Sequence, residues 1–448
     1  MTGADPLVVL CWEGDPSYIA PLRLSSRQVT VGVRNARAAN VVACPEAPDV
    51  LVAPGQYDLE ATLMKAGRPA EQPDLIVVWS SALRANLPVN LGAFRCPKLL
   101  ICGDTHHMQR PIGFMLEYAR SQPFDAVASA YDRQHLHWFL AAGFENCAWL
   151  PVITVQHMPM PWRAHRDDQV VFVGQTGAMH AWRQALLEGI AAAGVPLLAG
   201  QATRSKAAEL FSHSLISFNA CLNGDLNMRV FEVLSASGFL LTDRLSPQAG
   251  LELLLRPGVD CETYRDAHEL LDKIAFYRRT PAAALRIAVQ GVATYQRDHL
   301  ACNRIALLRR WMLDGVLPDW CNPRHDLRLM ASRAAAGQIP LRVAIYEMVQ
   351  ETQRAQREVS VLVSPGWPVA GILDLADLVR TQVSVIGPNP ALHTALGTAS
   401  MSGQVTMVEI AQAMERDWDI VLTTTTDSAS EPWRRRGRRV VFADFGAG

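Results

Sequence analysis

The amino-acid sequence predicts an α/β protein built from parallel sheets. Short apolar runs recur along the chain and alternate with stretches of helical spacing, from "LVVLCW" at 7–12 to "RRVVFADF" at 438–445. Such alternation of strand and helix is typical of parallel sheets joined by right-handed crossovers. The length of 448 residues exceeds one ordinary hydrophobic core and therefore indicates two or three domains.

The composition indicates buried cores and no strong charge preference. Of the residues, 49% are hydrophobic and 19% are charged, and the formal net charge at pH 7 is −1. Because no global basic field is present, nucleic acid and anionic membranes are not expected as partners. We interpret the basic run "RRRGRR" at 434–439 as a solvated turn before a strand, with contact to an anionic lipid or polymer as the alternative.

Cysteine usage and hydropathy predict a soluble, cytoplasmic protein without a membrane anchor. The nine cysteines include no Cys-x-x-Cys pair, and several lie in apolar runs, which is typical of reduced, buried thiols. The amino terminus has no basic segment leading into a long apolar one. No window of about 18 uninterrupted apolar residues occurs, so we expect no transmembrane segment.

The first 160 residues are expected to form one domain. Its first strand is "LVVLCW", directly followed by the turn signal "EGDPS". A second strand is expected at 28–33, a helix at 57–67 that ends in glycine, and a buried strand at 73–79. These elements would place the carboxyl ends of successive strands at one edge of a sheet, where ligands bind in α/β proteins.

The most polar cluster of this first half follows the strand expected in "CPKLLICGDTHH" at 96–107. Asp104, His106 and His107 lie where the strand would deliver its loop to a cleft. An Asp or His in such a place can take a proton from a reacting hydroxyl, and satisfied loop residues are the alternative. Adjacent side chains on extended backbone point apart and no other ligand motif lies nearby, so we expect no metal site.

The rest of the first domain carries two further histidines before a linker. A strand and a helix are expected at 124–144, with His135 and His137 on the helix surface. The proline-rich passage "HMPMPWRAHRDD" at 157–168 interrupts the periodicity and is the natural boundary between domains.

The second domain, 165–317, opens with "QVVFVGQTG", a strand followed by a glycine-containing loop and a helix. Gly174 would let backbone approach a ligand closely, and Gln175 would hydrogen-bond to it. No dinucleotide or phosphate-loop fingerprint is present, and turns of this kind commonly contain glycine without binding anything.

The stretch at 215–243 is the main candidate for ligand binding. It reads as a strand, an Asn-rich loop, a helix at 228–237 and a second strand at 239–242, with Gly238 where a helix end favours a left-handed residue. Asn227 is expected to cap the helix, Arg229 supplies a fixed positive charge for a phosphate, and Glu232 would hold a ribose diol. The alternative is a cap and a spaced helix pair without ligand.

Residues 318–339, which follow the second domain, read as a connector with two prolines. Residues 340–448 predict another small α/β unit, with four strands in "VSVLVS", "VSVIG", "IVLTTTT" and "RRVVFADF" and helices around "AGILDLADLVR" and "TMVEIAQAMERDW". Its loops lack the glycine fingerprint of a cofactor site. We interpret it as a degenerate Rossmann-like module for packing or for binding a protein partner.

The run "LNMRVFEVLSASGFLLTD" at 226–243, with "GLELLLRPGVDCETYRDAHELLDKIAFYRR" at 250–279 and "HLACNRIALLRRWM" at 299–312, resembles the donor-binding half of group 1 glycosyltransferases related to the spore-maturation (CgeB-like) family. The family pattern matches the following positions: Asn227, Arg229, Phe231, Glu232, Gly238, Thr242 and Asp243. The resemblance implies the GT-B architecture of two facing Rossmann-like domains, with 340–448 as an additional small C-terminal α/β domain.

The resemblance further implies a glycosyltransferase that uses a nucleotide-sugar substrate and needs neither a cofactor nor a metal. The expected donor-binding residues are Gly174, Gln175, Asn227, Arg229 and Glu232, and the expected catalytic residues are Asp104 and His106. The acceptor would be a glycan, a lipid-linked sugar or a protein. Two alternatives stay open: a catalytically degenerate scaffold that binds a nucleotide or glycan, and a methyltransferase centred on 340–448, against which the missing glycine-rich loop argues.

Overall fold

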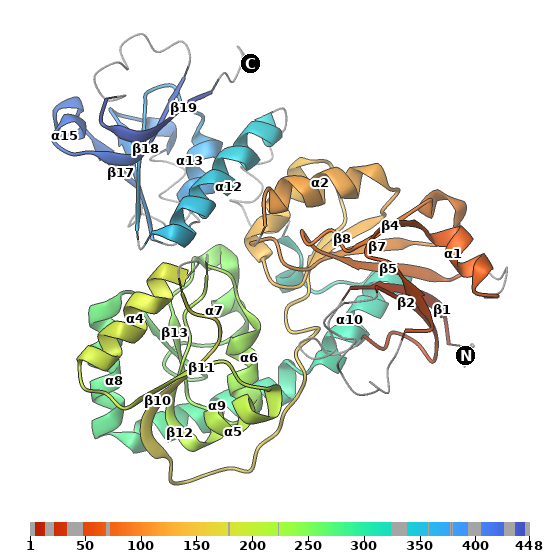
Figure 1. The fold of residues 1–448 in the computed structure, drawn as a ribbon, viewed down its shortest axis with the longest axis horizontal. Helices are drawn as coiled ribbons and strands as arrows, with labels where there is room; N and C mark the ends of the chain where they lie inside the picture. Colours follow the sequence, from red (N-terminus) through yellow and green to blue (C-terminus); the bar gives the residue numbers. More distant parts are fainter. Residues whose placement is uncertain are drawn as a thin grey trace. The chain divides into compact units, whose positions relative to one another are not determined.

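The computed structural model describes residues 5–13, 22–33, 48–68, 72–106, 108–177, 180–222, 224–323, 338–356, 358–376, 378, 380–392, 405–424 and 435–443 (Figure 1). The chain packs into two compact units. The first comprises Met1–Gln175, Gly189–Cys221 and Asp225–Pro323, and the second comprises Thr176–Glu188, Leu222–Gly224 and Arg324–Gly448. All three of the larger sheets are parallel, as the sequence predicts for an α/β protein.

A seven-stranded sheet comes first along the chain. Its strands lie in the order β3-β2-β1-β5-β7-β8-β9. They span Val50–Val52 (β3), Arg27–Val33 (β2), Leu7–Trp12 (β1), Leu75–Ser80 (β5), Lys98–Cys102 (β7), Ala126–Ser129 (β8) and Cys147–Trp149 (β9). The strand order reverses between β1 and β5, and such a switch point is where α/β sheets bind ligands.

The central strands of this sheet are buried throughout, because their sequences are almost entirely apolar. Every residue of β5, β7 and β8 is buried. The helices that connect them are α1 (Leu59–Lys65), α2 (Pro111–Ser121) and α3 (Leu136–Ala141). A small parallel pair, β4 (Gly55–Asp58) and β6 (Asn86–Val89), lies beside the main sheet.

A five-stranded sheet follows, in the order β11-β10-β12-β13-β14. Its strands span Leu197–Gly200 (β11), Asp167–Val173 (β10), Ser214–Phe218 (β12), Leu240–Asp243 (β13) and Glu262–Tyr264 (β14). The accompanying helices are α4 (Ala181–Ala192), α5 (Arg204–His213), α6 (Met228–Ser235), α7 (Leu251–Leu254), α8 (Ala267–Arg279) and α9 (Pro281–Asp298). The loop between β12 and α6 is the Asn-rich stretch singled out by the sequence.

Helix α10 (Ala301–Asp314) leaves the second sheet and packs on the first. Its Leu308 and Trp311 belong to the same hydrophobic cluster as Val77 and Ile101 of the first sheet. Arg309 also forms an ion pair with Asp5, 2.7 Å from Nη2 to Oδ1. The helix therefore braces the first domain.

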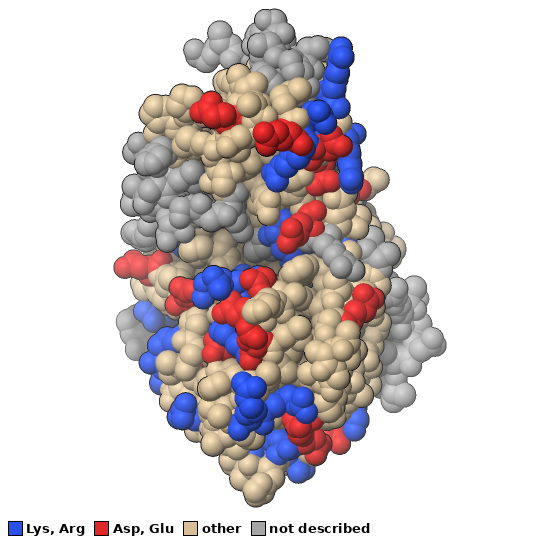
Figure 2. Space-filling view, turned by 90° about the vertical axis from the view of Figure 1, so that its left-hand side faces the viewer, with Lys and Arg blue, Asp and Glu red and all other residues tan. Residues whose placement is uncertain are grey.

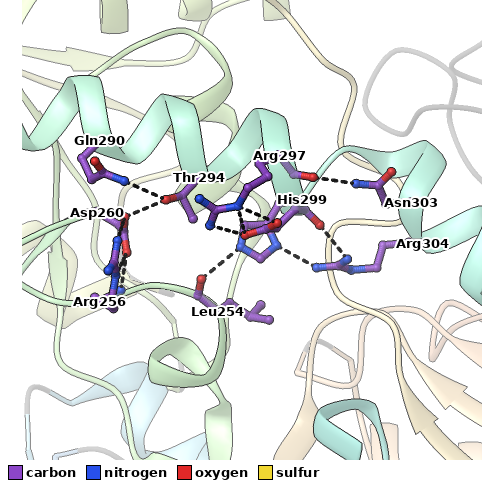
Figure 3. A network of polar contacts seen from close by, with 10 residues as sticks. Leu254, Arg256, Asp260, Gln290, Thr294, Arg297, His299, Asn303 and Arg304 are labelled. Carbon is purple, nitrogen blue, oxygen red and sulfur yellow. Dashed lines mark hydrogen bonds and ion pairs between the residues drawn. The ribbon is translucent and has the colours of Figure 1, made fainter. Parts of the chain in front are cut away.

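A buried polar junction fixes the point where α9 gives way to α10 (Figure 3). Arg304 donates to the carbonyl oxygens of Pro151 (3.1 Å) and Asp298 (2.9 Å) and to Nδ1 of His299 (2.8 Å). His299 Nε2 in turn lies 3.0 Å from the Leu254 carbonyl oxygen. The Arg304 guanidinium thus ties the first domain to the two helices, and His299 extends the junction to the end of α7.

The third sheet has the order β17-β16-β15-β18-β19. Its strands span Val405–Val408 (β17), Thr381–Ile386 (β16), Val359–Val363 (β15), Trp418–Thr424 (β18) and Gly437–Ala443 (β19), with helices α12 (Ile339–Ala355), α13 (Val369–Ala376) and α15 (Ile410–Met414). Strand β17 was not predicted: its residues were expected in a helix. The observed helix α15 begins only after Glu409, which forms a capping box with Gln412.

The end of α6 differs from the sequence expectation. Ser237, with φ +60°, occupies the left-handed position, and Gly238 does not. Gly238 is instead required by close packing, because a Cβ there would lie 2.7 Å from Val233 Cγ1 and 3.1 Å from Ser217 Oγ. This glycine lets the end of α6 approach the sheet closely.

The surface carries charges of both signs. Lys and Arg side chains are interspersed with Asp and Glu over the face shown in Figure 2. Some exposed charges of the chain are paired, for example Arg110 with Glu117 and Lys206 with Glu209. Within the described segments, every helix is too short or too polar to cross a membrane.

Candidate active site

Polar residues follow four neighbouring strands of the first sheet, β1, β5, β7 and β8. Because these strands are parallel, their carboxyl ends meet at one edge. We call this group the first-sheet edge, and it consists of Glu13, Ser81, Asp104, Thr105, His106 and Asp132. His107, the third member of the predicted cluster, lies outside the described residues.

Asp132 is the centre of a buried network within the first-sheet edge. His106 Nε2 bonds to Asp132 Oδ1, and the Thr105 hydroxyl donates to Asp132 Oδ2 at 2.7 Å. Thr105 Oγ1 also lies 2.7 Å from His135 Nδ1. Because the hydroxyl proton is directed at Asp132, His135 must be the donor in that contact. Both oxygens of the carboxylate thus receive a proton donor.

The network separates the two histidines into different charge states. Burial opposes the charged form of His106, but the charge of Asp132 and its hydrogen bond outweigh burial and raise the pKa of His106 to about 9. The negative charge of Asp225, in the loop before α6, acts in the same direction. Burial dominates at His135 and lowers its pKa to about 3. At neutral pH the pair is therefore imidazolium and neutral imidazole.

The same side chains form a group whose geometry would suit a metal ion. One ligand atom from each of His106, Asp132 and His135 lies within 4.8 Å of the others. These atoms are already occupied by one another and by Thr105. A metal would have to displace those hydrogen bonds, so the donor set fits a hydrogen-bonded network better than a coordination site.

Glu13 and Asp104 lie at the more open side of the first-sheet edge. Asp104 is half-buried, and its Oδ1 accepts a hydrogen bond from the backbone N–H of His106 at 2.7 Å. Glu13 is also half-buried, yet its Oε2 atom is enclosed and has no hydrogen-bond partner. Burial raises the pKa of Glu13 to about 7, against hydrogen bonds with the Ser81 side chain and the Asn86 backbone that lower it.

The second sheet presents its own polar edge. We call it the second-sheet edge, and it comprises residues at or after the ends of β10, β12 and β13 together with the first turns of α6: Gly174, Gln175, Asn219, Cys221, Asp225, Asn227, Arg229, Glu232 and Asp243. Asp243 accepts from the backbone N–H of Cys221 at 3.1 Å, and Asn219 donates to Thr242 Oγ1 at 3.0 Å. Tyr264 donates to the Asn219 carbonyl oxygen at 2.9 Å. Hydrogen bonds between the ends of β12, β13 and β14 thus hold this edge together.

The predicted residues of α6 lie together at the start of this helix. Asn227 is the N-cap residue by position, but its side chain makes no capping hydrogen bond. Its Nδ2 instead donates to Asn219 Oδ1 at 3.3 Å, and its Oδ1 is buried without a partner. Arg229 and Glu232 form an ion pair one turn apart, with 22% and 20% of their side chains exposed. The expected helix pair is therefore present, while the expected capping bond is absent.

Gly174 and Gln175 directly follow strand β10 on the same edge. A Cβ on Gly174 would lie 2.9 Å from the ring of Phe172, so packing already requires glycine here. Gly174 N–H donates to the Gly200 carbonyl oxygen at 2.8 Å. Gln175 is exposed. Close packing therefore explains this glycine without a ligand.

Tyr131 directly precedes Asp132 of the first-sheet edge and contacts helix α6 of the second sheet. Its hydroxyl contacts Met228 Sδ on α6 at 3.4 Å. Burial raises the pKa of Tyr131 above its usual range, and the negative charges of Asp104 and Glu232 both contribute. Charged residues of both edges therefore lie close enough to this side chain to raise its pKa.

Several members of the site were not found from the sequence. No role was predicted for Thr105 or Asp132, and Glu13 was interpreted as part of the turn signal "EGDPS". His135 and His137 were expected on a helix surface, and this expectation is wrong: both are buried, because the helix α3 packs all its residues inward. The signal that would have found Glu13 and Asp132 is their position just after buried apolar strands, the same feature that drew attention to Asp104.

A match to a known protein family covers the second sheet. Residues 160–310 match the family described as glycosyl transferase-like. No functionally curated protein is similar enough to the chain to give a match.

Solved structures resemble the chain at low identity. Sucrose-phosphate synthase from Thermosynechococcus elongatus is 11% identical with a TM-score of 0.49, over 70% of this chain and 100% of that one. HepE from Anabaena, in complex with UDP and glucose, is 12% identical with a TM-score of 0.48, over 69% and 99% of the two chains. A glycosyltransferase from Rickettsia africae is 10% identical with a TM-score of 0.43, over 64% and 91%.

Proposed function

We propose that the chain is a glycosyltransferase that moves a sugar from a nucleotide-sugar donor to a hydroxyl group of a glycan, a lipid-linked sugar or a protein. The observation that carries this proposal is the pair of parallel-sheet edges that meet at Tyr131. One edge belongs to a glycosyl transferase-like domain and the other carries acid–base residues. Such an arrangement supports donor binding on one side and acceptor chemistry on the other.

The donor would bind at the second-sheet edge. The amino terminus of α6 and Arg229 supply positive charge for a diphosphate whose negative charge grows as it leaves. Glu232 would hold the ribose diol, and the unpaired Oδ1 of Asn227 would accept a hydrogen bond from a sugar or ribose hydroxyl. Gly174 and Gln175 complete this side of the proposed site, where the backbone comes close to the ligand.

The acceptor would bind at the first-sheet edge, beside the predicted catalytic residues Asp104 and His106. His106 is protonated at neutral pH because its pKa is raised to about 9 by Asp132, against the effect of burial. In that state it donates hydrogen bonds and adds positive charge near a departing phosphate. Asp104, half-buried and hydrogen-bonded to the backbone of His106, would orient an acceptor hydroxyl.

The proposed reaction needs no metal and no cofactor beyond the nucleotide-sugar substrate. Fixed dipoles and cations would carry the charge that a metal ion supplies in other transferases. The motif at 226–243 also supports a place near the spore-maturation-related branch of group 1 glycosyltransferases. We assign the protein to the cytoplasm, and the sheet at 359–443 is proposed to bind a protein partner rather than a second substrate.

Thermal unfolding in the presence of UDP, GDP, ADP and dTDP tests the donor site. A ligand at a hundred times its dissociation constant raises the free energy of unfolding by about 2.7 kcal/mol. One nucleotide is expected to raise Tm, and the shift is expected to vanish in Glu232→Ala. Glu252→Ala, on the short helix α7 of the same domain, is the matched control and should keep the shift.

Donor hydrolysis then separates an enzyme from a scaffold. Release of the nucleoside diphosphate from its sugar conjugate, lost in Arg229→Ala, is expected of an enzyme. A nucleotide-dependent rise of Tm without any turnover would instead favour the scaffold. No shift with any of the four nucleotides would contradict the donor site itself.

A further inference from the structure

Arg380 is the last residue before β16 in the third sheet, and its side chain contacts two segments that follow strands of the second sheet. Its Nη2 atom donates a hydrogen bond to the Leu222 carbonyl oxygen at 2.7 Å. Its guanidinium carbon lies 5.5 Å from the centre of the Trp182 ring, within the range of a cation–π contact. The two segments, Thr176–Glu188 and Leu222–Gly224, belong to the same compact unit as the third sheet.

Both contacted segments follow strands whose ends carry the proposed donor residues. Leu222 lies in the loop between β12 and α6, shortly before Asn227. Trp182 lies in the first turn of α4, which follows β10 and its loop. Ligands bind in α/β proteins at the carboxyl ends of parallel strands, so both segments belong to the donor side. Arg380 therefore contacts the backbone that leads to the donor residues.

The loop after β12 is held from both sheets. The second sheet holds its first part, because the backbone N–H of Cys221 donates to Asp243 at 3.1 Å. One residue further, the third sheet holds the Leu222 carbonyl oxygen through Arg380. A hydrogen bond from a charged donor is stronger than one between neutral groups, and this arginine is half-buried with its Nε atom enclosed. Loss of the Arg380 side chain would therefore release the loop just before α6.

The backbone of Arg380 has a conformation that glycine adopts more easily. Its φ is +61°, in the left-handed region. Its carbonyl oxygen accepts from the Val359 N–H of β15 at 3.0 Å, and the hydroxyl of the following Thr381 accepts from Gln353 Nε2 at 3.3 Å. Strained backbone persists where the surrounding structure fixes it, and it is frequent at functional sites. An arginine at this position therefore indicates a use for its side chain beyond the turn.

We propose that Arg380 is a positioning residue for the donor site, an inference that rests on the glycosyltransferase activity proposed above. By holding the Leu222 carbonyl group and lying over Trp182, it keeps the loops after β10 and β12 in the arrangement that binds the nucleotide. A loop that is already ordered loses less conformational entropy when its ligand binds, so the affinity rises. The third sheet, which lies outside the family match at 160–310, thus serves the transferase site.

Arg380→Gly separates positioning from stability. The Tm without ligand should change little, because relief of the strained φ offsets the greater freedom of glycine in the unfolded chain. UDP, titrated into the full chain by calorimetry, should nevertheless bind about tenfold more weakly, which corresponds to about 1.4 kcal/mol. Arg416→Ala is the matched control: Arg416 lies over Trp418 in the same unit, 3.8 Å from the ring centre, and its loss should leave UDP affinity unchanged.

Hydrolysis of UDP-glucose gives a second readout that a merely structural role would not change. Loss of donor binding that is equal in the ground and transition states raises KM alone, so Arg380→Gly should raise KM about tenfold and change kcat by less than about twofold. Arg380→Lys keeps the charge and a hydrogen-bond donor but loses the planar group over Trp182, and it should restore part of the affinity.

Trp182→Leu tests the second contact of Arg380. It should weaken UDP binding about threefold, the scale of an exposed cation–π contact. The double variant with Arg380→Gly should bind UDP no more weakly than Arg380→Gly alone, because both side chains support one arrangement and their effects are not additive. Additive losses would contradict this coupling.

Hydrogen exchange follows the loop without any nucleotide. The backbone amides of residues 224–230 should exchange about tenfold faster in Arg380→Gly than in the wild type, because the local opening free energy falls. Exchange in β7 of the first sheet, Lys98–Cys102, should stay the same and serves as the internal control.

The possible failures are distinguishable. An unchanged UDP dissociation constant in Arg380→Gly would remove Arg380 from the donor site and leave the proposed function standing, and faster exchange in that case would mark a structural tie only. A fall in kcat with KM unchanged would also contradict positioning. Absence of both UDP binding and hydrolysis in the wild type would instead overturn the proposed function with this donor, and the role of Arg380 with it.

Discussion

The first-sheet edge and the second-sheet edge are built in opposite ways. Around Asp132 the first has a closed network of titratable groups, buried and bonded to one another. The second has hydrogen bonds between neutral groups around Asn219, together with the partly exposed ion pair of Arg229 and Glu232. The titratable groups are thus concentrated at the first-sheet edge, whereas the second-sheet edge consists mainly of hydrogen bonds between strand ends.

This difference matches the two demands of transfer between a charged donor and a hydroxyl acceptor. A leaving diphosphate needs charge that stays in place, which helix dipoles and an always-charged guanidinium provide. An acceptor hydroxyl needs a group that gains and loses protons near the working pH, which an imidazole or a carboxyl group with a raised pKa provides. Variants at the two edges should therefore fail in different measurements.

The largest expected effect comes from Asp132→Ala. It leaves the buried His106 without its counter-charge, and breaking a buried pair costs about 3–5 kcal/mol of unfolding free energy. The pKa of His106 is raised to about 9 by Asp132 in spite of burial, so this stabilisation is complete below pH 6.5 and is lost as pH rises through 9. Urea unfolding should show the full deficit at pH 6 and a smaller one at pH 10.

A matched control for that variant is the exposed pair of Arg110 and Glu117 in the same domain. Glu117→Ala should cost about 0–1 kcal/mol at either pH, because solvent screens exposed pairs. If Asp132→Ala cost no more than this control, the picture of a charge-coupled first-sheet edge would be wrong.

Next in size is Arg229→Ala, which tests the second-sheet edge. Removing one group that stabilises transition-state charge lowers turnover by about a hundredfold, or about 2.7 kcal/mol. Stability should change little, because the ion pair with Glu232 is partly exposed. Release of UDP from UDP-glucose measures the effect, and Arg265→Ala, paired with Glu269 on α8, is the control. Loss of stability without loss of turnover would reduce Arg229 to a structural role.

Gly238→Ala tests whether the second-sheet edge depends on close backbone packing. The added methyl would meet Val233 Cγ1 at 2.7 Å, and overpacking of this kind costs about 1–3 kcal/mol. Gly189→Ala, in α4 with nothing within 4 Å of the new Cβ, should instead stabilise by about 0.5–1 kcal/mol. Equal urea midpoints for the two variants would contradict a role for close packing at Gly238.

The smallest effect on stability is expected from Asn227→Ala. A side-chain cap is worth about 1 kcal/mol, but Asn227 makes no capping bond, so we expect a loss of about 0.5 kcal/mol or less. The nucleotide-dependent rise in Tm should nevertheless shrink, because the unpaired Oδ1 would be lost to the ligand. A loss near the full value of a cap would show that the side chain caps α6 in solution.

Much of the fold could be predicted because apolar runs mark buried strands directly. Four of the five strands of the third sheet were found in this way, whereas β17 was missed because only Val405 of its residues Val405–Val408 is buried and the strand runs directly into a helix. At the end of α6 the sequence pointed to the right turn but to the wrong residue. Gly238 is there for packing, and Ser237 takes the strained position.

Sequence patterns identified site residues that directly follow a single strand or begin a helix, but not the contacts that join residues from different strands. Asp104 and His106 were found because they follow a strand directly, and Arg229 because its helix was recognisable. The link from His106 to Asp132 joins residues 26 apart in sequence, and no local pattern encodes it. Likewise, the raised pKa of Glu13 depends on burial by neighbouring strands, and sequence analysis has no measure of that.

The junction at Arg304 has a consequence for the ionic strength that the molecule tolerates. The acceptors of its guanidinium are two carbonyl oxygens and a neutral imidazole nitrogen, not carboxylates. Dissolved ions screen attraction between opposite charges, but they have little to screen here, and the group is buried. The tie between the domains should therefore hold in concentrated salt and loosen in acid, once His299, whose pKa burial lowers to about 4, takes up a proton.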